Sequence, residues 1–138
     1  MFLTPIRAEK VLFKDIWVLL KDFVYHHAPT EYLPDDFTVT VPAGFYTDFA
    51  SVPRLPVIYR KYGNTGHEAA IIHDYLYRLD SVPLVSKDVA DRTFYDALRE
   101  MGLSERHAAI MYDGVVIGGE SSYHAKAVKD VLKGDQNV

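Results

Sequence analysis

The sequence of 138 residues contains no cysteine. This absence excludes disulfides, zinc sites built from thiolates, and thiol nucleophiles. Any catalysis by this chain must therefore use histidine, carboxylates, serine or threonine, tyrosine, or a hard metal ion. A serine nucleophile is disfavoured, because Ser51, Ser121 and Ser122 lack the glycine context of a nucleophile elbow.

A long hydrophobic run is also missing. The most apolar stretch, residues 16–20, is followed at once by Lys21 and Asp22, whereas a membrane-spanning helix needs about 18 apolar residues. We therefore expect no transmembrane segment. The start of the chain lacks the basic-then-apolar order and the cleavage site of a secretory signal, so we expect synthesis in the cytoplasm.

The sequence has no excess of positive charge. It holds 15 lysines and arginines against 19 aspartates and glutamates, which gives a net charge of −4. A protein that binds a phosphate backbone needs the opposite sign, so we expect no nucleic-acid partner. Aromatic residues are abundant by contrast, with ten tyrosines and seven phenylalanines. Tyrosine suits half-buried positions, where the ring packs and the hydroxyl stays in water, so this abundance favours a contact surface.

Hydrophobic residues make up 49% of the chain, which is enough to build one core without metal or disulfide support. We expect a single domain over residues 1–138. Its strand-rich part covers residues 1–60, its helical part residues 64–133, and a polar tail residues 134–138. The sequence shows no internal repeat.

Strands are predicted in the first part of the chain, over residues 17–20, 23–25 and 37–41. The last of these alternates between apolar and polar residues with period two, as a half-buried strand does. These segments predict a small antiparallel sheet. Pro53 and Pro56 then prevent regular structure, so we expect an ordered loop over residues 50–56.

Helices are predicted from residue 65 onward. The first, over about 65–79, begins with a capping-box spacing in which Thr65 and Glu68 satisfy free amide groups. Ser86 and Ser104 are expected to cap the second and third helices, and a fourth helix is expected after Ser122. The predicted fold class is α+β, a small N-terminal antiparallel sheet followed by a bundle of three to four helices.

A cluster of polar residues lies beside the apolar stripe of the first two helices. His73 and Tyr77 are four residues apart and so share a helix face, while Asp74 is rotated by about 100° toward the flank. Asp91 is next to the apolar stripe of the second helix and should be half buried. A buried carboxylate needs a hydrogen-bonding partner, and His73 across the helical hairpin is the simplest candidate. The stripe of the first helix is predicted to contain Ala69, Ile72, Leu76 and Leu79.

Such a pair suits general-base catalysis. A carboxylate that fixes one imidazole nitrogen leaves the other free to accept a proton from water. His73 would be the base and Asp91 its orienting group. Asp74 could hold a hard cation such as calcium, with backbone carbonyls and water as the other ligands, beside an ester carbonyl.

Structural interpretations stand beside these chemical ones. A histidine–aspartate pair on helices is more often structural than catalytic. In that interpretation Asp91 caps a neighbouring loop, and Tyr77 has no role beyond packing. Asp48 fits a turn that ties down backbone amides before Pro53, and as an alternative it is a second carboxylate that faces the site.

Two other histidine pairings, His67 with His73 and His26 with His27, are poor candidates for a shared site, whereas the sequence assigns no role to His107 or His124. His67 and His73 are about 120° apart on a helix, which disfavours zinc, since helical zinc sites use an i, i+4 pair. His26 and His27 are neighbours on a strand and so point to opposite faces. We interpret them as ordinary surface and core residues.

Three segments carry a family resemblance: TDFASVP at residues 47–53, HDYLY at 73–77 and ADRTF at 90–94. Together they resemble a phage- and prophage-encoded family of unknown function, over about residues 35–118. The resemblance implies a viral or prophage origin, synthesis in the bacterial host cytoplasm, and other virion proteins as partners if the chain is carried in the particle.

The helix motif also resembles that of secreted phospholipase A-two, particularly the short bacterial kind. In that family the histidine is the base, the adjacent aspartate binds calcium, and an aspartate on the second helix orients the histidine. The resemblance implies these roles for His73, Asp74 and Asp91, with Tyr77 hydrogen-bonded to Asp91. The chain differs in lacking the disulfides usual in that family, and its only glycine-rich stretch before the motif is residues 62–66.

Three functional hypotheses follow. The first is a phage-encoded protein with a hydrolase-like site, calcium-dependent on phospholipids or other esters. The second is a noncatalytic component of the virion, for instance at the tail tip, in which the cluster locks the helical hairpin. The third is a cell-wall peptidase, which predicts zinc bound by His73 and a carboxylate.

Overall fold

The structure is a computed structural model that describes residues 1–14, 16–47, 66–119 and 123–124. In these residues five strands precede three helices, which confirms the predicted α+β class. The strands are β1 (Ala8–Lys10), β2 (Trp17–Leu19), β3 (Phe23–His27), β4 (Phe37–Val41) and β5 (Tyr46–Thr47), and the helices are α2 (His67–Leu76), α3 (Lys87–Glu100) and α4 (Glu105–Gly118). No helix in the described ranges is long and apolar enough to cross a membrane.

The N-terminal strands are antiparallel, as predicted, and they divide into a two-stranded and a three-stranded sheet. β3 pairs with β4, from Phe23 opposite Val41 to His27 opposite Phe37. β2 pairs with both β1 and β5 in a separate three-stranded sheet. The pairing of β5 with β2 joins segments far apart in the sequence, which local alternation does not reveal.

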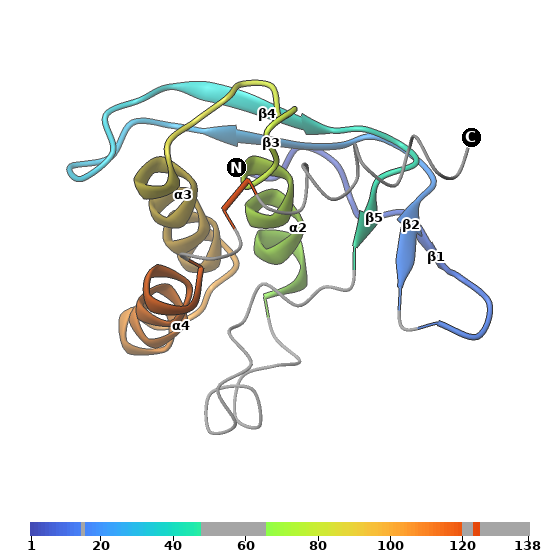
Figure 1. The fold of residues 1–138 in the computed structure, drawn as a ribbon. Coiled ribbons are helices and arrows are strands. Elements are labelled where there is room, and N and C mark those ends of the chain that lie inside the picture. Colours follow the sequence, from blue (N-terminus) through green and yellow to red (C-terminus); the bar gives the residue numbers. More distant parts are fainter. Residues whose placement is uncertain (15, 48–65, 120–122, 125–138) are drawn as a thin grey trace.

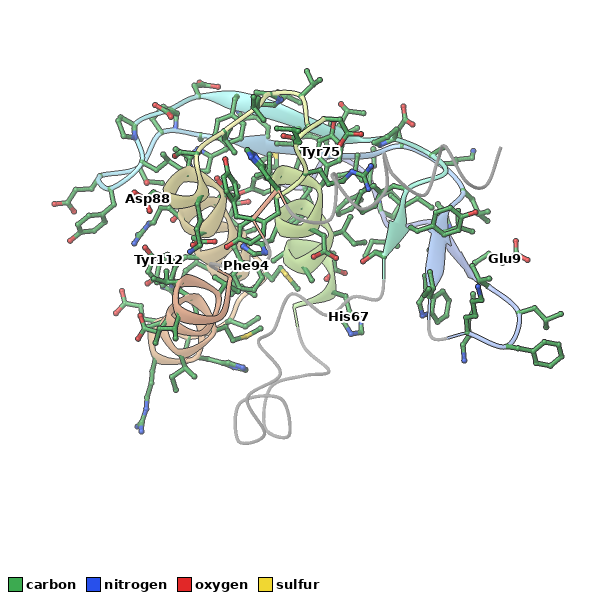
Figure 2. All side chains as sticks on the ribbon, in the orientation of Figure 1. Glu9, His67, Tyr75, Asp88, Phe94 and Tyr112 are labelled. Carbon is green, nitrogen blue, oxygen red and sulfur yellow. The ribbon has the colours of Figure 1, made fainter. Side chains whose placement is uncertain are left out.

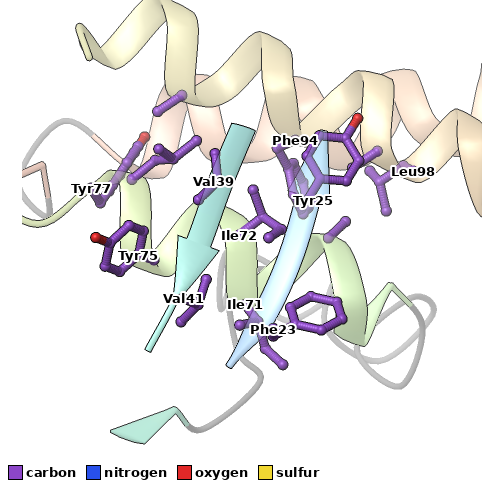
Figure 3. Packing of buried hydrophobic residues seen from close by; sticks show 14 of the residues in the cluster. Phe23, Tyr25, Val39, Val41, Ile71, Ile72, Tyr75, Tyr77, Phe94 and Leu98 are labelled. Carbon is purple, nitrogen blue, oxygen red and sulfur yellow. The ribbon is translucent and has the colours of Figure 1, made fainter. Parts of the chain in front are cut away.

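The β3–β4 hairpin lies across α2 and α3, and α4 packs against α3 (Figure 1). Ile71 and Ile72 of α2 meet the inward side chains of the hairpin, and Phe94 and Leu98 of α3 complete this layer (Figure 3). Inward and outward residues alternate along β3 and β4 as the period of a strand requires. The core therefore places α2 between the hairpin and α3.

Serine caps begin α3 and α4, as predicted. Ser86 Oγ accepts the amide hydrogen of Val89 at 3.2 Å, and Ser104 Oγ accepts that of His107 at 3.1 Å. After α3 the chain turns at Gly102, which has a φ of +94°, a conformation that glycine adopts without strain.

The start of α2 differs from the predicted capping box. The residue that precedes the first turn is Gly66, with a φ of +77° and no side-chain cap. A Cβ there would lie 2.8 Å from Leu98 Cδ2, so close packing against α3 requires glycine. Glu68 is therefore one position too early for a capping box, and Thr65 lies outside the described residues.

The end of α2 also differs. The helix ends at Leu76 with Tyr77 as its C-cap, three residues before the predicted end. Ala69, Ile72 and Leu76 are fully buried as predicted, but Leu79 is 49% exposed, so its assignment to the core stripe was wrong. The predicted loop over 50–56, the fourth helix, the polar tail and Asp48 lie outside the described residues. The single-domain organisation over 1–138 stays a prediction.

Candidate active site

The structure brings His73 and Asp91 together between α2 and α3. His73 Nε2 lies 2.8 Å from Asp91 Oδ1, and the two residues are only 3% and 1% exposed. The ring of Phe94, which lies between the two helices (Figure 2), is 5.0 Å from that of His73 between centroids. The predicted contact across the helical hairpin is thus present.

Tyr77 is the third member of this cluster. Its hydroxyl donates to the same Oδ1 of Asp91 at 2.5 Å, and its ring centroid is 4.0 Å from that of His73. Although Tyr77 is the C-cap, its backbone amide still donates to the carbonyl of His73. The predicted i, i+4 neighbourhood of the two side chains is therefore preserved.

Lys87 completes the cluster, and the sequence analysis missed it. Its ammonium donates to Asp91 Oδ2 at 2.8 Å and to the carbonyl of Val116 on α4 at 3.0 Å. The signal was available, since Lys87 and Asp91 are an i, i+4 pair at the start of a helix. Lys87 thus links the Asp91 carboxylate on α3 to the C-terminal part of α4.

Opposing effects act on the pKa of Asp91. Burial raises this pKa, but the hydrogen bonds from His73, Lys87 and Tyr77 together lower it by more than burial raises it. The pKa of Asp91 therefore lies below its ordinary value. Asp91 is therefore ionised near neutral pH and accepts hydrogen bonds only. His73 Nε2 must carry the hydrogen in that contact, which leaves Nδ1 of a neutral ring as the basic nitrogen.

Nδ1 of His73 is buried and has no hydrogen-bond partner among the described residues. An unsatisfied buried polar atom costs about 1–3 kcal/mol, and native structures retain few of them. The nitrogen lies in an aromatic environment formed by Tyr77 and Phe94. Within the described residues, Nδ1 is thus the ring nitrogen of His73 that has no hydrogen-bond partner.

The end of α4 covers the cluster from one side. A Cβ on Gly119 would lie 2.3 Å from the Tyr77 hydroxyl, so the backbone there approaches the site closely. Tyr123 packs edge-on against Tyr77 at 5.3 Å between centroids, and its hydroxyl donates to the carbonyl of Val85. Cavities of about 500 and 380 Å³ are lined by described residues, and His73 lines neither.

Asp74 points to a different neighbour. Its Oδ2 accepts a hydrogen bond from the Thr47 hydroxyl of β5 at 3.2 Å. Calcium takes six to eight oxygen ligands, yet the described part of the chain holds no group of three histidine, aspartate or glutamate residues around a possible metal position. Within these residues Asp74 is a single carboxylate and does not complete a calcium site. Asp48, the other candidate, falls outside them.

Residues 17–115 match the family described as Protein of unknown function (DUF1353). The chain belongs to this family. No curated protein and no solved structure gives a significant match. The part of the chain that matches DUF1353 includes His73, Tyr77, Lys87 and Asp91, so the whole cluster lies within the family region.

This DUF1353 chain also contains a second buried histidine–aspartate pair. His27 Nε2 lies 2.7 Å from Asp96 Oδ2, and His27 Nδ1 lies 2.8 Å from the carbonyl oxygen of Asp35. His26, on the other face of the strand, contacts Thr38 and is partly exposed, so the predicted division of the two histidines is confirmed. His27 and Asp96 are 69 residues apart, so no local sequence pattern predicts their pairing. Both ring nitrogens of His27 have partners, whereas only Nε2 of His73 has one among the described residues.

Proposed function

We propose that this chain is a hydrolase in which His73 is the general base and Asp91 its orienting group. The observation that carries the proposal is the difference between the two ring nitrogens of His73. Nε2 is held by an ionised carboxylate, while Nδ1 is buried with no partner among the described residues. That is the arrangement a base needs before it accepts a proton.

The proton transfers follow from this arrangement. Nδ1 takes a proton from water, the resulting hydroxide attacks the ester carbonyl, and the imidazolium returns the proton to the departing alkoxide oxygen. Asp91 stabilises the imidazolium through its contact with Nε2. Tyr77 and Lys87 keep the carboxylate in position by occupying Oδ1 and Oδ2. General-base assistance of this kind contributes about 10²–10⁴-fold.

The surroundings of the base support an apolar ester as substrate. The rings of Tyr77 and Phe94 flank His73, and Nδ1 has almost no exposed surface. The cluster must therefore open when substrate arrives, and an acyl chain can replace the aromatic contacts that are lost. The likeness of the helix motif to secreted phospholipase A-two also supports phospholipids or related esters.

Calcium at Asp74 is a separate part of the proposal. It is supported by the adjacent positions of His73 and Asp74 in the motif. Because the described residues supply one carboxylate there, the proton transfers above involve no metal. Calorimetric titration of calcium into wild type and Asp74→Asn tests this part, and equal heats from the two proteins would refute it.

We also propose that the protein is encoded by a phage or prophage and made in the host cytoplasm. The three motifs at residues 47–53, 73–77 and 90–94 support this origin. Mass spectrometry of purified particles tests the location, since it detects the chain only if the particle contains it.

The hydrolase proposal is tested with two matched substitutions. Phospholipid and simple ester hydrolysis is measured, with and without calcium, for wild type, His73→Gln and His27→Gln. We expect His73→Gln to lose at least about 100-fold in turnover, while His27→Gln is less stable but keeps its turnover below its unfolding temperature. Absence of hydrolysis by the wild type, or equal losses in both variants, would refute the proposal.

One observation favours a second candidate, a noncatalytic virion component in which the cluster is a structural lock. Oδ1 of Asp91 accepts from His73 and Tyr77, and Oδ2 accepts from Lys87. Lys87 also donates to the carbonyl of Val116 on α4. A lock predicts that substitutions of His73 and Asp91 lower stability and nothing else. It also predicts that the chain is present in purified particles.

A further inference from the structure

His27, the last residue of β3, joins the β3–β4 hairpin to α3. Its Nε2 lies 2.7 Å from Asp96 Oδ2 on α3, and its Nδ1 lies 2.8 Å from the carbonyl oxygen of Asp35 in the loop between the two strands. The side chains of His27 and Asp96 are only 1% and 8% exposed. Buried polar groups of this kind must find their hydrogen-bond partners within the protein.

The two groups that contact the His27 ring are both hydrogen-bond acceptors. A carbonyl oxygen only accepts, so Nδ1 carries the hydrogen in the contact with Asp35. An ionised carboxylate also only accepts, so Nε2 carries a hydrogen in the contact with Asp96. A neutral imidazole has a single N–H group and cannot make both contacts, and a protonated Asp96 that donates to Nε2 would bring in the same additional proton. Either way, the pair holds one proton more than a neutral ring and an ionised carboxylate.

The charged groups around the pair favour a proton on the ring. On α3, Arg92 Nε lies 3.4 Å from Asp96 Oδ1, which favours the ionised carboxylate and therefore the imidazolium. On β3, burial and the carboxylates of Glu100 and Asp96 raise the pKa of the Tyr25 hydroxyl. Tyr25 is therefore neutral, and the negative charge that its hydroxyl senses also attracts a cationic His27 ring.

The loop side of the ring is consistent with a cation as well. The ring of Phe37 on β4 stacks on that of His27 at 5.2 Å between centroids, and the face of an aromatic ring attracts a cation. The acidic side chain on this side, Asp36, pairs with His26 on the outer face of the hairpin at 3.1 Å. Those two side chains are 37% and 60% exposed, so solvent screens their charges from the buried pair.

We propose that His27 and Asp96 form a buried proton-binding site, and that the bound proton completes the attachment of the β3–β4 loop to α3. Loss of the proton leaves a neutral ring, which keeps one of its two contacts and sets two acceptors against each other at the other. In that state either the Asp35 carbonyl or the Asp96 carboxylate moves away from the ring. The hairpin and α3 are then joined by one hydrogen bond fewer.

The loop that responds to this proton carries an exposed tyrosine. Tyr32 is 71% exposed, and its ring centroid lies 4.7 Å from the guanidinium carbon of Arg92 on α3. Since Arg92 also pairs with Asp96, a carboxylate that leaves the His27 ring changes the surroundings of Tyr32. The proposal is independent of hydrolysis and holds whether or not His73 is catalytic.

The bound proton links folding to pH. The folded chain holds a proton that the unfolded chain releases above the ordinary histidine value of about 6.5. The stability that the pair contributes is therefore fully present below that value and falls as the pH rises, by up to about tenfold in the folding equilibrium constant per pH unit. Asp96→Asn removes this dependence, because its amide group donates to Nε2 of a neutral ring whose Nδ1–H still bonds to Asp35.

Urea denaturation at about pH 6 and about pH 9 measures this difference. The ratio of the Asp96→Asn folding constant to that of the wild type should rise by at least about tenfold between the two conditions. His27→Gln, which removes the titrating ring, should show the same rise. Asp88→Asn, a control at an exposed carboxylate of α3, should keep its ratio constant within about twofold. An Asp96→Asn ratio that does not change with pH would overturn the proposal.

Nitrogen-15 NMR of the chain labelled in its histidines detects the proton directly. At about pH 7.5, where an ordinary histidine is mostly neutral, His27 should show two protonated ring nitrogens in the wild type and one in Asp96→Asn. His73, with a hydrogen on Nε2 alone, should show one in both proteins and is the internal reference. An unprotonated ring nitrogen on His27 of the wild type would refute the proposal, and this result does not depend on how stable any variant is.

Discussion

Replacing Lys87 with methionine removes the charge that neutralises Asp91 and keeps most of the apolar stem. Asp91 is 1% exposed, so its Oδ2 would remain buried with no donor, while Oδ1 keeps His73 and Tyr77. Removing one partner of a buried ion pair costs about 3–5 kcal/mol. Since the Lys87 side chain is partly exposed and two donors remain on Asp91, we expect a loss of about 3 kcal/mol in the free energy of unfolding at pH 7.

The pH dependence makes this prediction specific. The pKa of Asp91 lies below its ordinary value of 3.8, so the stability that its bonds contribute is fully present above that value and is lost as the pH falls through the folded-state pKa. Loss of Lys87 raises the folded-state pKa of Asp91. The difference in unfolding free energy between wild type and variant should therefore shrink below a pH of about 4.

Urea denaturation of wild type and Lys87→Met at pH 7 and near pH 3 provides the measurement. Lys87→Arg should retain most of the stability, and Arg106→Met, which removes an exposed cation from α4, should change it by less than about 0.5 kcal/mol. The variant with both Lys87→Met and Asp91→Asn should lose less unfolding free energy than the sum of the losses in the two single variants. A Lys87→Met loss below about 1 kcal/mol, or the same loss at both pH values, would refute this account of the buried pair.

Three further predictions concern the same region. Gly119→Ala would place a Cβ 2.3 Å from the Tyr77 hydroxyl and 2.4 Å from the Val115 carbonyl oxygen, so thermal unfolding should show a loss of about 1–3 kcal/mol, and an unchanged melting temperature would contradict the close approach. Tyr77→Phe removes one donor from Asp91 and should cost about 1–3 kcal/mol in urea denaturation, with no change if the 2.5 Å contact is absent in solution. Asp74→Asn should abolish any calcium heat seen with the wild type in calorimetry, and retention of that heat would remove Asp74 from the ligand set.

The elements that sequence analysis predicted correctly are those with local signals. Ser86 and Ser104 precede apolar periodic segments at capping positions, and both caps are present. The errors lie where tertiary contacts decide. Gly66 replaces the predicted cap because Leu98 of α3 leaves no room for a side chain, and β5 joins β2 through a pairing that no local alternation encodes.

The cluster could be predicted in part for the same reason. Asp91 interrupts an apolar stripe and so demands a partner, and the i, i+4 spacing selected His73 and Tyr77 as neighbours. The i, i+4 spacing of Lys87 and Asp91 is an equally local signal, but a lysine at the start of a helix is usually exposed, so its contact with a buried carboxylate was not predicted. His27 and Asp96 could not be paired from sequence, since only the β3–β4 hairpin lying over α3 brings them together.

The two buried pairs give the strongest argument about the role of His73. A fold that needs a buried histidine only as a structural lock can occupy both ring nitrogens, and at His27 it does so with Asp96 and the Asp35 carbonyl. At His73 the described residues occupy only Nε2 and leave Nδ1 buried in an aromatic environment. A partner for Nδ1 would contribute about 1 kcal/mol to stability, which a purely structural pair has reason to gain. The proposed general base needs a nitrogen without a partner to receive a proton, and so activity measured with His73→Gln against His27→Gln separates the two roles.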